Sequence, residues 1–233
     1  MWFFMKIALA TFPWAYFTPG GGEIQIEKLF EELKLKNIEV EKFNQWLPQK
    51  EFEIFHFFSC MGGSFDFCNY LKNINKKLLI SSSLWITRDK KSEYPLEAII
   101  NQLRLADFII VNSIMEKNIL SDVTGINSQL FRVVHNGFDE KLLKYRNKIV
   151  DPPANIPKEW LGEYILCLAN IEKRKNQNKL VKAARKLNKN LILVGNIRDY
   201  KYYDSLKIKD NDKNVIFYGH VNQKSKQFIS LFK

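Results

Sequence analysis

Short apolar runs alternate with segments of helical periodicity along the chain, and this alternation limits the folds open to it. KIALATF (6–12), EIFHFFS (53–59) and KLLIS (77–81) are mostly apolar and resemble buried strands. Between the first two runs, apolar residues recur at the spacing of one helix face: Ile26, Leu29, Phe30 and Leu33. Buried strands that alternate with helices are typical of a parallel sheet covered on both faces. We therefore predict an α/β fold.

The same pattern predicts the remaining elements. Further strands are expected at 38–43, 107–113, 130–137, 164–170, 190–195 and 214–219. Further helical segments are expected at 95–106, 178–187, 199–207 (helical or looped) and 225–232.

A proline-rich stretch, YRNKIVDPPANIPKEWLGE (145–163), interrupts the alternation. Proline fixes φ and lacks an N–H, so this stretch is a poor helix or central strand and resembles a linker. We predict a first domain at 1–145, a linker at 146–163 and a second domain at 164–233. Since the second block holds only three predicted strands, we expect it to be an incomplete Rossmann-like domain.

The charge balance favours anionic partners. Of 233 residues, 36 are Lys or Arg and 25 are Asp or Glu, which gives a net charge of +11. The basic residues form clusters, which could hold the first domain against anionic lipid or could equally be solvated faces. The basic residues of the first domain that could make this lipid contact are Lys72, Lys76, Lys77, Lys90 and Lys91. The aromatic residues lie in apolar runs typical of a core, so no nucleic-acid partner is expected.

The cysteines and the apolar start of the chain bear on its compartment. Cys60, Cys68 and Cys167 are odd in number and lack paired C-x-x-C spacing, so we expect free thiols and no metal site. The start is interrupted by Lys6 and Pro13 and no small-residue cleavage site follows, which argues against a signal peptide. No later run is long enough to span a membrane. We predict a cytoplasmic protein.

Three consecutive glycines, Gly20 to Gly22, lie between the first predicted strand and the first predicted helix. Ligands of parallel sheets bind beyond the carboxyl ends of strands, and the N–H groups of a helix start attract phosphate. The pattern G-x-G-x-x-G is not complete, because Gln25 takes the place of the third glycine, and no P-loop lysine follows. The turn is either a phosphate site of another kind or a tight turn without a ligand.

Five segments of the chain, taken in order, carry a family resemblance. They are KIALATF…PGGGEIQIEKLFEELKLKNIEVEKF, ADFIIVNSIMEKNIL (106–120), FRVVHNGFDEKLL (131–143), YILCLANIEKRKNQNKLVKAA (164–184) and LILVGN…NVIFYGHVNQKSKQFISLF. This series resembles the group 1 glycosyltransferases of GT-B fold. The resemblance implies two Rossmann-like domains and sugar transfer from a nucleotide-diphosphate donor to a glycan or lipid-linked acceptor. The acceptor would bind mainly to the first domain (1–145) and the donor mainly to the second (164–233). It further implies retention of configuration, no metal, no cofactor and a role in polysaccharide biosynthesis.

The resemblance also implies roles for particular residues. Gly21 and Gly22 would lie under the donor diphosphate, and Lys175 would neutralise its charge. Asn170 stands where the family has an arginine, and Arg174, directly before Lys175, could supply the missing charge. The remaining donor residue is Gly195, which matches a glycine that lets the backbone approach the nucleotide.

Two histidines and three serines have competing interpretations. His56 matches a catalytic cleft histidine of the family, although a lone histidine among aromatics is more typical of a hydrogen-bonded core residue. Ser81 to Ser83 stand where the family has a second cleft histidine; they could hydrogen-bond a sugar, but we interpret them as an ordinary strand end. His135 and Asn136-Gly137 are interpreted as a hinge with left-handed backbone angles.

One feature of the family is missing. A pair of glutamates seven residues apart, which binds the donor sugar in the family, is expected just beyond Lys233. The chain is therefore expected to be either a piece of a longer glycosyltransferase or a non-catalytic relative that serves as a binding or partner subunit.

Overall fold

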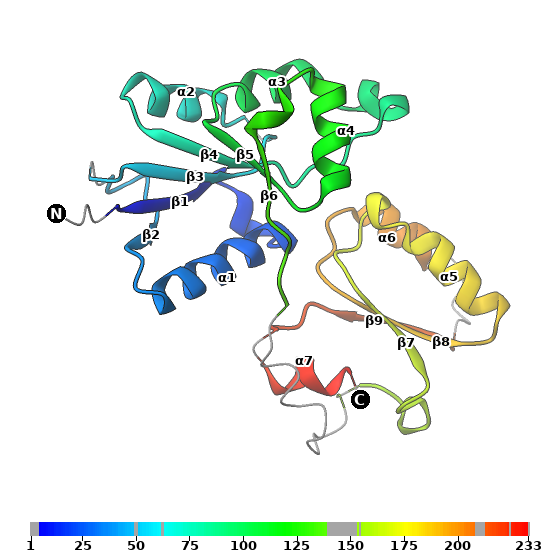
Figure 1. The fold of residues 1–233 in the computed structure, drawn as a ribbon. Helices are drawn as coiled ribbons and strands as arrows, with labels where there is room; N and C mark the ends of the chain where they lie inside the picture. The colour runs from blue at the N-terminus through cyan, green and yellow to red at the C-terminus, as the bar shows by residue number, and fades with distance from the viewer. Residues whose placement is uncertain are drawn as a thin grey trace. The chain divides into compact units, whose positions relative to one another are not determined.

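The computed structural model describes residues 5–48, 51–61, 63–138, 153, 155–207, 213–223 and 225–232. They form two compact units, residues 1–137 and 138–233, each with a parallel sheet and covering helices (Figure 1). The predicted boundary at 145/146 lies outside the described residues.

The first unit contains a six-stranded parallel sheet with the order β2-β1-β3-β4-β5-β6. Its strands are β1 (Ile7–Thr11), β2 (Val40–Lys42), β3 (Ile54–Phe58), β4 (Lys77–Ser81), β5 (Phe108–Val111) and β6 (Phe131–Val133). Each coincides with a predicted strand. In the central strands Leu9 pairs with His56, which pairs with Leu79, so these three side chains lie on the same face.

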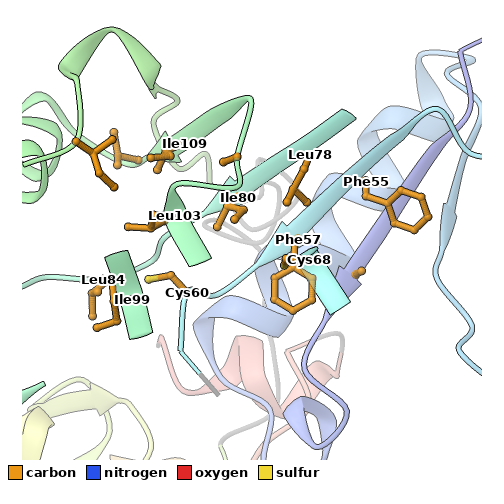
Figure 2. Close-up of a cluster of buried hydrophobic side chains, with 14 of the residues drawn as sticks. Phe55, Phe57, Cys60, Cys68, Leu78, Ile80, Leu84, Ile99, Leu103 and Ile109 are labelled. Carbon is orange, nitrogen blue, oxygen red and sulfur yellow. The ribbon is translucent and has the colours of Figure 1, made fainter. Parts of the chain in front are cut away.

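Helices cover both faces of this sheet, as the apolar strands require. α1 (Gly21–Leu35) lies on one side, where Ile26 packs with Leu9 and Phe58 (Figure 1). The other side is covered by α2 (Phe65–Asn73), α3 (Leu96–Leu103) and α4 (Ile114–Thr124). Figure 2 shows the larger core on that side, where Phe57, Ile80 and Ile109 are almost completely buried.

Two of these helices, α2 and α4, were not predicted. α2 spans nine residues and buries Cys68 and Leu71, which is too little to show a helical period. α4 does carry a start signal, because Ser113 is its N-cap and accepts a hydrogen bond from the Glu116 N–H at 3.0 Å. This S-x-x-E pattern could have been read from the sequence.

The thiols behave as small core side chains. Cys60 and Cys68 are buried in the core of Figure 2, and Cys167 is half-buried; all three are free. Burial raises the pKa of both Cys60 and Cys68 to about 12, so these thiols stay protonated and unreactive at neutral pH.

The second unit repeats the plan on a smaller scale. Its parallel strands, in the order β7-β8-β9, are β7 (Tyr164–Leu168), β8 (Asn190–Val194) and β9 (Val215–Gly219). α5 (Gln177–Lys186) and α6 (Tyr200–Leu206) cover one face, and α7 (Lys226–Ser230) packs on the other. Ile156 and Trp160, which lie in the predicted linker, are buried in the core beside α7. The described end of that linker is therefore part of the second unit's core.

Among the described residues, none of the helices combines the length and the apolar composition needed to cross a membrane.

Candidate functional site

The glycine turn of the first unit opens onto free space. Gly20 has an extended backbone, and its N–H donates to Glu23 Oε2 at 2.6 Å, which closes the first turn of α1. Neither Gly21 nor Gly22 has a positive φ, and a Cβ added to either would meet no atom within 4 Å. Neither backbone conformation nor packing therefore demands glycine at these positions. Their bare backbone leaves the start of α1 open to an approaching anion.

Lys175 lies in the connection between β7 and α5 of the second unit, which corresponds to the glycine turn between β1 and α1 of the first. It ends a 3₁₀ helix (Lys173–Lys175) after β7, and Asn176, with a left-handed φ of 56°, then starts α5. Burial raises the pKa of the Cys167 thiol on β7, while the Lys175 ammonium acts in the opposite direction. The exposed ammonium of Lys175 therefore lies within electrostatic reach of this strand.

Asn170 ties together three elements of the second unit. Its Oδ1 accepts from the Asn196 N–H at 3.2 Å, and its backbone carbonyl accepts from Gln177 Nε2 at 2.8 Å. Gln177 is fully buried in the first turn of α5. Its Oε1 has no hydrogen-bond partner in the part of the chain that the structure describes. Asn170 thus joins the ends of β7 and β8 to α5, and its donor-binding role stays a prediction.

Gly195, directly after β8, is required by packing within the protein. A Cβ at this position would lie 2.1 Å from the Ala169 carbonyl oxygen and 2.9 Å from the Asn170 nitrogen. Glycine here permits close contact with the end of β7, which is a different reason from the predicted approach to a nucleotide. The donor contact of Gly195 stays a prediction.

Arg174 has an acidic neighbour that the sequence pattern did not reveal. Its Nη2 donates to Glu172 Oε1 at 2.8 Å, and Glu172 Oε2 lies 4.0 Å from Arg198 Nη1. Part of the Arg174 charge is therefore offset by Glu172. The proposal that Arg174 replaces a family arginine stays a prediction.

Further polar residues missed in the sequence follow β8 and β9. Asn196 Nδ2 lies 3.3 Å from His220 Nδ1, and each residue comes just after the end of its strand. Their positions after parallel strands were the available signal, since such residues share one edge of the sheet. A cavity of about 60 Å³ lies nearby, too small for a nucleotide. Its lining residues are Ile171, Leu193, Gly195, Ile197, Tyr203, Phe217 and Gly219.

His56 lies in the middle of β3, where its contacts are those of a core residue. Its Nε2 is 2.8 Å from Ser81 Oγ, and its ring stacks on Phe58 with 4.3 Å between ring centroids. Burial lowers the pKa of His56 to about 4, so the imidazole is neutral at pH 7. These contacts account for a histidine here without chemistry, and its catalytic role stays a prediction.

His56 should make the protein less stable in mild acid. Between pH 6.5 and pH 4 the unfolded chain binds a proton at this imidazole and the folded chain does not. The free energy of unfolding therefore decreases as the pH is lowered through this range. The loss for this group is on the order of 3 kcal/mol. Urea unfolding from pH 7.5 to pH 4 should show this slope, and His56→Gln should flatten it. Ser81→Ala, which keeps the imidazole, should retain the slope; an unchanged slope in His56→Gln would contradict the assignment.

The left-handed backbone angles predicted at Asn136-Gly137 are wrong, because neither residue has a positive φ. The division between the two units does fall directly after Gly137. Asn136 Oδ1 accepts from Gln25 Nε2 on α1 at 2.8 Å, and His135 Nδ1 lies 3.0 Å from the Asn112 carbonyl oxygen. Side-chain hydrogen bonds to α1 and to the end of β5, not turn geometry, hold this segment on the first unit.

Two Rossmann-like units, with parallel sheets of six and three strands, define an α/β protein of the GT-B type. Neither a protein-family model nor a curated protein sequence matches the chain. The chain is similar to Anabaena Alr3699/HepE in complex with UDP-glucose, with a TM-score of 0.70 and 18% identity over 97% of this chain and 71% of that one. It is also similar to UDP-GlcNAc 2-epimerase from Methanocaldococcus jannaschii (TM-score 0.54, 11% identity, 97% and 76% coverage). A glycosyltransferase from Rickettsia africae ESF-5 is similar too (TM-score 0.53, 16% identity, 98% and 70% coverage). These similarities establish the fold.

Proposed function

We propose that this chain is a glycosyltransferase that takes a sugar from a nucleotide-diphosphate donor. The observation that carries the proposal is the fold: 97% of the chain is similar to a protein solved with UDP-glucose and with UDP. The open helix start at Gly21 and Gly22 and the exposed Lys175 are the local features that fit a diphosphate.

In this proposal the chemistry depends on stabilising the departing diphosphate. The negative charge that develops as the sugar leaves is stabilised by the ammonium of Lys175, a compact point charge in the second unit. The first N–H groups of α1, at Gly21 and Gly22, offer a second anion-binding position. Group 1 membership, transfer of a hexose with retention and without a metal, and a role in polysaccharide biosynthesis belong to the same proposal.

Contact with an anionic membrane near a lipid-linked acceptor is also part of the proposal. The lysines predicted to make this contact lie in two separate regions of the first unit. Lys72 in the last turn of α2 and Lys77 at the start of β4 pair with Asp107 at 2.8 and 3.8 Å. Lys90 and Lys91 lie in the 3₁₀ helix Arg88–Glu93, which follows β4. Sedimentation with vesicles of neutral or anionic lipid tests the contact, which we expect to be weak because the lysines do not form one cluster.

Incubating the chain with a panel of nucleotide sugars, first UDP-glucose, and measuring UDP release tests the donor proposal. Release that increases with added glycan supports transfer. Binding of UDP without turnover would favour the alternative, a non-catalytic binding or partner subunit. Conversion of UDP-GlcNAc to its 2-epimer, followed by NMR, would favour the chemistry named for the epimerases of similar fold. Absence of any nucleotide-sugar binding would refute the proposal.

Replacing Gly22 by leucine should weaken the binding of UDP while leaving the stability of the fold nearly unchanged. The added side chain has room, since no atom lies within 4 Å of a Cβ there, so the free energy of unfolding should stay within about 1 kcal/mol of the original. The same side chain would block the first N–H groups of α1 and weaken UDP binding by about tenfold. Calorimetric titration with UDP measures the effect, with Gly22→Ala as the control. Unchanged UDP affinity in both variants would remove this turn from the donor site.

A further inference from the structure

The connection that carries Lys175 is exposed along its second half and buried where it ends. Residues 173–176 are all exposed, whereas Gln177, the first residue of α5, has no exposed surface. Packing restrains exposed residues little, so the place of the Lys175 ammonium depends on the hydrogen bonds of the connection. Gln177 is the buried residue nearest to Lys175 in the chain, and its contacts therefore bear directly on that place.

Gln177 closes the connection on itself. Its Nε2 donates to the Asn170 carbonyl at 2.8 Å, across seven positions of the chain. Asn170 is held from the other side, because its Oδ1 accepts from the Asn196 N–H at 3.2 Å. The neighbouring Ile171 N–H donates to the Asn196 carbonyl at 2.8 Å. Gln177 thus ties the start of α5 to the anchored end of the connection, and Lys175 lies within the loop that this bond closes.

Gln177 takes the place of a side-chain cap at the start of α5. Asn176, directly before the helix, has a left-handed φ of 56°, and within the described ranges its side chain makes no capping hydrogen bond. The Asn178 N–H donates to the Tyr202 hydroxyl at 2.8 Å, which holds the helix start to α6 but not to the connection. The amide of Gln177 supplies a bond in the direction of Lys175.

The second polar atom of Gln177 shows that core stability alone does not explain a glutamine here. Its Oε1 is buried and has no hydrogen-bond partner in the described part of the chain. A buried acceptor without a partner lowers stability, and an apolar side chain of the same length would avoid that loss. What a glutamine adds at this position is the bond from its Nε2 to Asn170.

We propose that Gln177 is a positioning residue that holds the Lys175 ammonium in place for the donor diphosphate; this rests on the proposed function. Because its side chain is fully buried, Gln177 acts through the connection and not by contact with the ligand. A charge that is already in place stabilises a departing diphosphate without first having to be ordered.

Replacing Gln177 by methionine keeps the length of the side chain and removes the donor. UDP affinity should fall by about fivefold, the loss of one hydrogen bond, whereas uridine affinity should not change. The urea unfolding midpoint should change little, since a hydrogen bond and an orphan oxygen are lost together. Gln102→Met is the matched control: Gln102 is buried on α3, its Nε2 donates to the Ser59 carbonyl at 3.1 Å, and UDP affinity should stay unchanged.

A double-mutant cycle separates positioning from a purely structural role. In a Lys175→Ala background, Gln177→Met should cause no further loss of UDP affinity, because the group it positions is gone. Equal losses in both backgrounds, or equal losses for UDP and uridine, would overturn the inference. Gln177→Leu is measured in parallel, and a large fall of the urea midpoint in both variants would overturn it as well, because Gln177 would then serve folding.

Amide hydrogen exchange followed by NMR tests the positioning without any nucleotide. The Lys175 N–H donates to the Glu172 carbonyl at 2.9 Å, and the Asn176 N–H donates to the Lys173 carbonyl at 3.1 Å. Both amides should exchange about fivefold faster in Gln177→Met, while Leu191 of β8 keeps its rate. Unchanged rates at both would refute the inference whether or not UDP binds. Faster exchange in a chain whose parent binds no UDP would refute the donor proposal alone.

Discussion

Replacing Gly195 by alanine should destabilise the second unit by more than about 3 kcal/mol. The added Cβ would lie 2.1 Å from the Ala169 carbonyl oxygen and 2.5 Å from its carbonyl carbon. Both atoms belong to the backbone at the end of β7, so no side chain can rotate away. Relief requires β7 and β8 to separate, which would also strain the hydrogen bond between the Gly195 N–H and the Gly219 carbonyl at 3.0 Å.

Hydrogen exchange followed by mass spectrometry locates this effect. Peptides that cover β7 and β8 should lose protection in Gly195→Ala, while peptides that cover β3 and β4 of the first unit should keep it. Gly21→Ala is the matched control, because a Cβ there meets no atom within 4 Å and stability should change by less than about 1 kcal/mol. Equal protection of β7 and β8 in Gly195→Ala and the parent chain would show that the close approach at Ala169 is not required.

Replacing Lys175 by alanine should abolish most of the proposed transfer activity. Removing a single group that stabilises transition-state charge commonly lowers kcat by about 10²–10³-fold. Affinity for UDP should fall by about tenfold, whereas affinity for uridine, which lacks the diphosphate, should not change. This comparison of UDP with uridine remains informative even if the chain binds the donor without turning it over.

Two variants control for general charge effects. Lys173→Ala removes another exposed ammonium from the same 3₁₀ helix and should leave UDP binding unchanged. Lys175→Arg keeps the charge and should retain part of the affinity. Equal losses in Lys173→Ala and Lys175→Ala would mean that the helix acts only through its net charge, and the assigned role of Lys175 would be wrong.

Most of the fold could be predicted because parallel strands covered on both faces must be apolar on both faces. Runs such as KLLIS and NLILVG have this composition, and they form β4 and β8. Helices were predicted where their apolar period was long enough, as in α1 and α3. α2 buries only Cys68 and Leu71 among nine residues, so its period was too short to recognise.

The candidate site was less predictable than the fold, since its residues depend on which strands become neighbours. Asn196 and His220 are unremarkable in the sequence and meet only because β8 and β9 pair. His56 looked like a candidate for chemistry, but the pairing of β3 with β4 gives its imidazole a partner in Ser81.

The sequence by itself determined that this chain forms parallel α/β units, because continuous apolar runs and the apolar period of 3.6 residues are local properties of a segment. Only the tertiary structure decided why Gly195 must be glycine and why Gly21 and Gly22 need not be. The difference lies in the space around each backbone atom, which is set by residues distant in the chain: Ala169 fills it at Gly195, and no atom fills it at the start of α1.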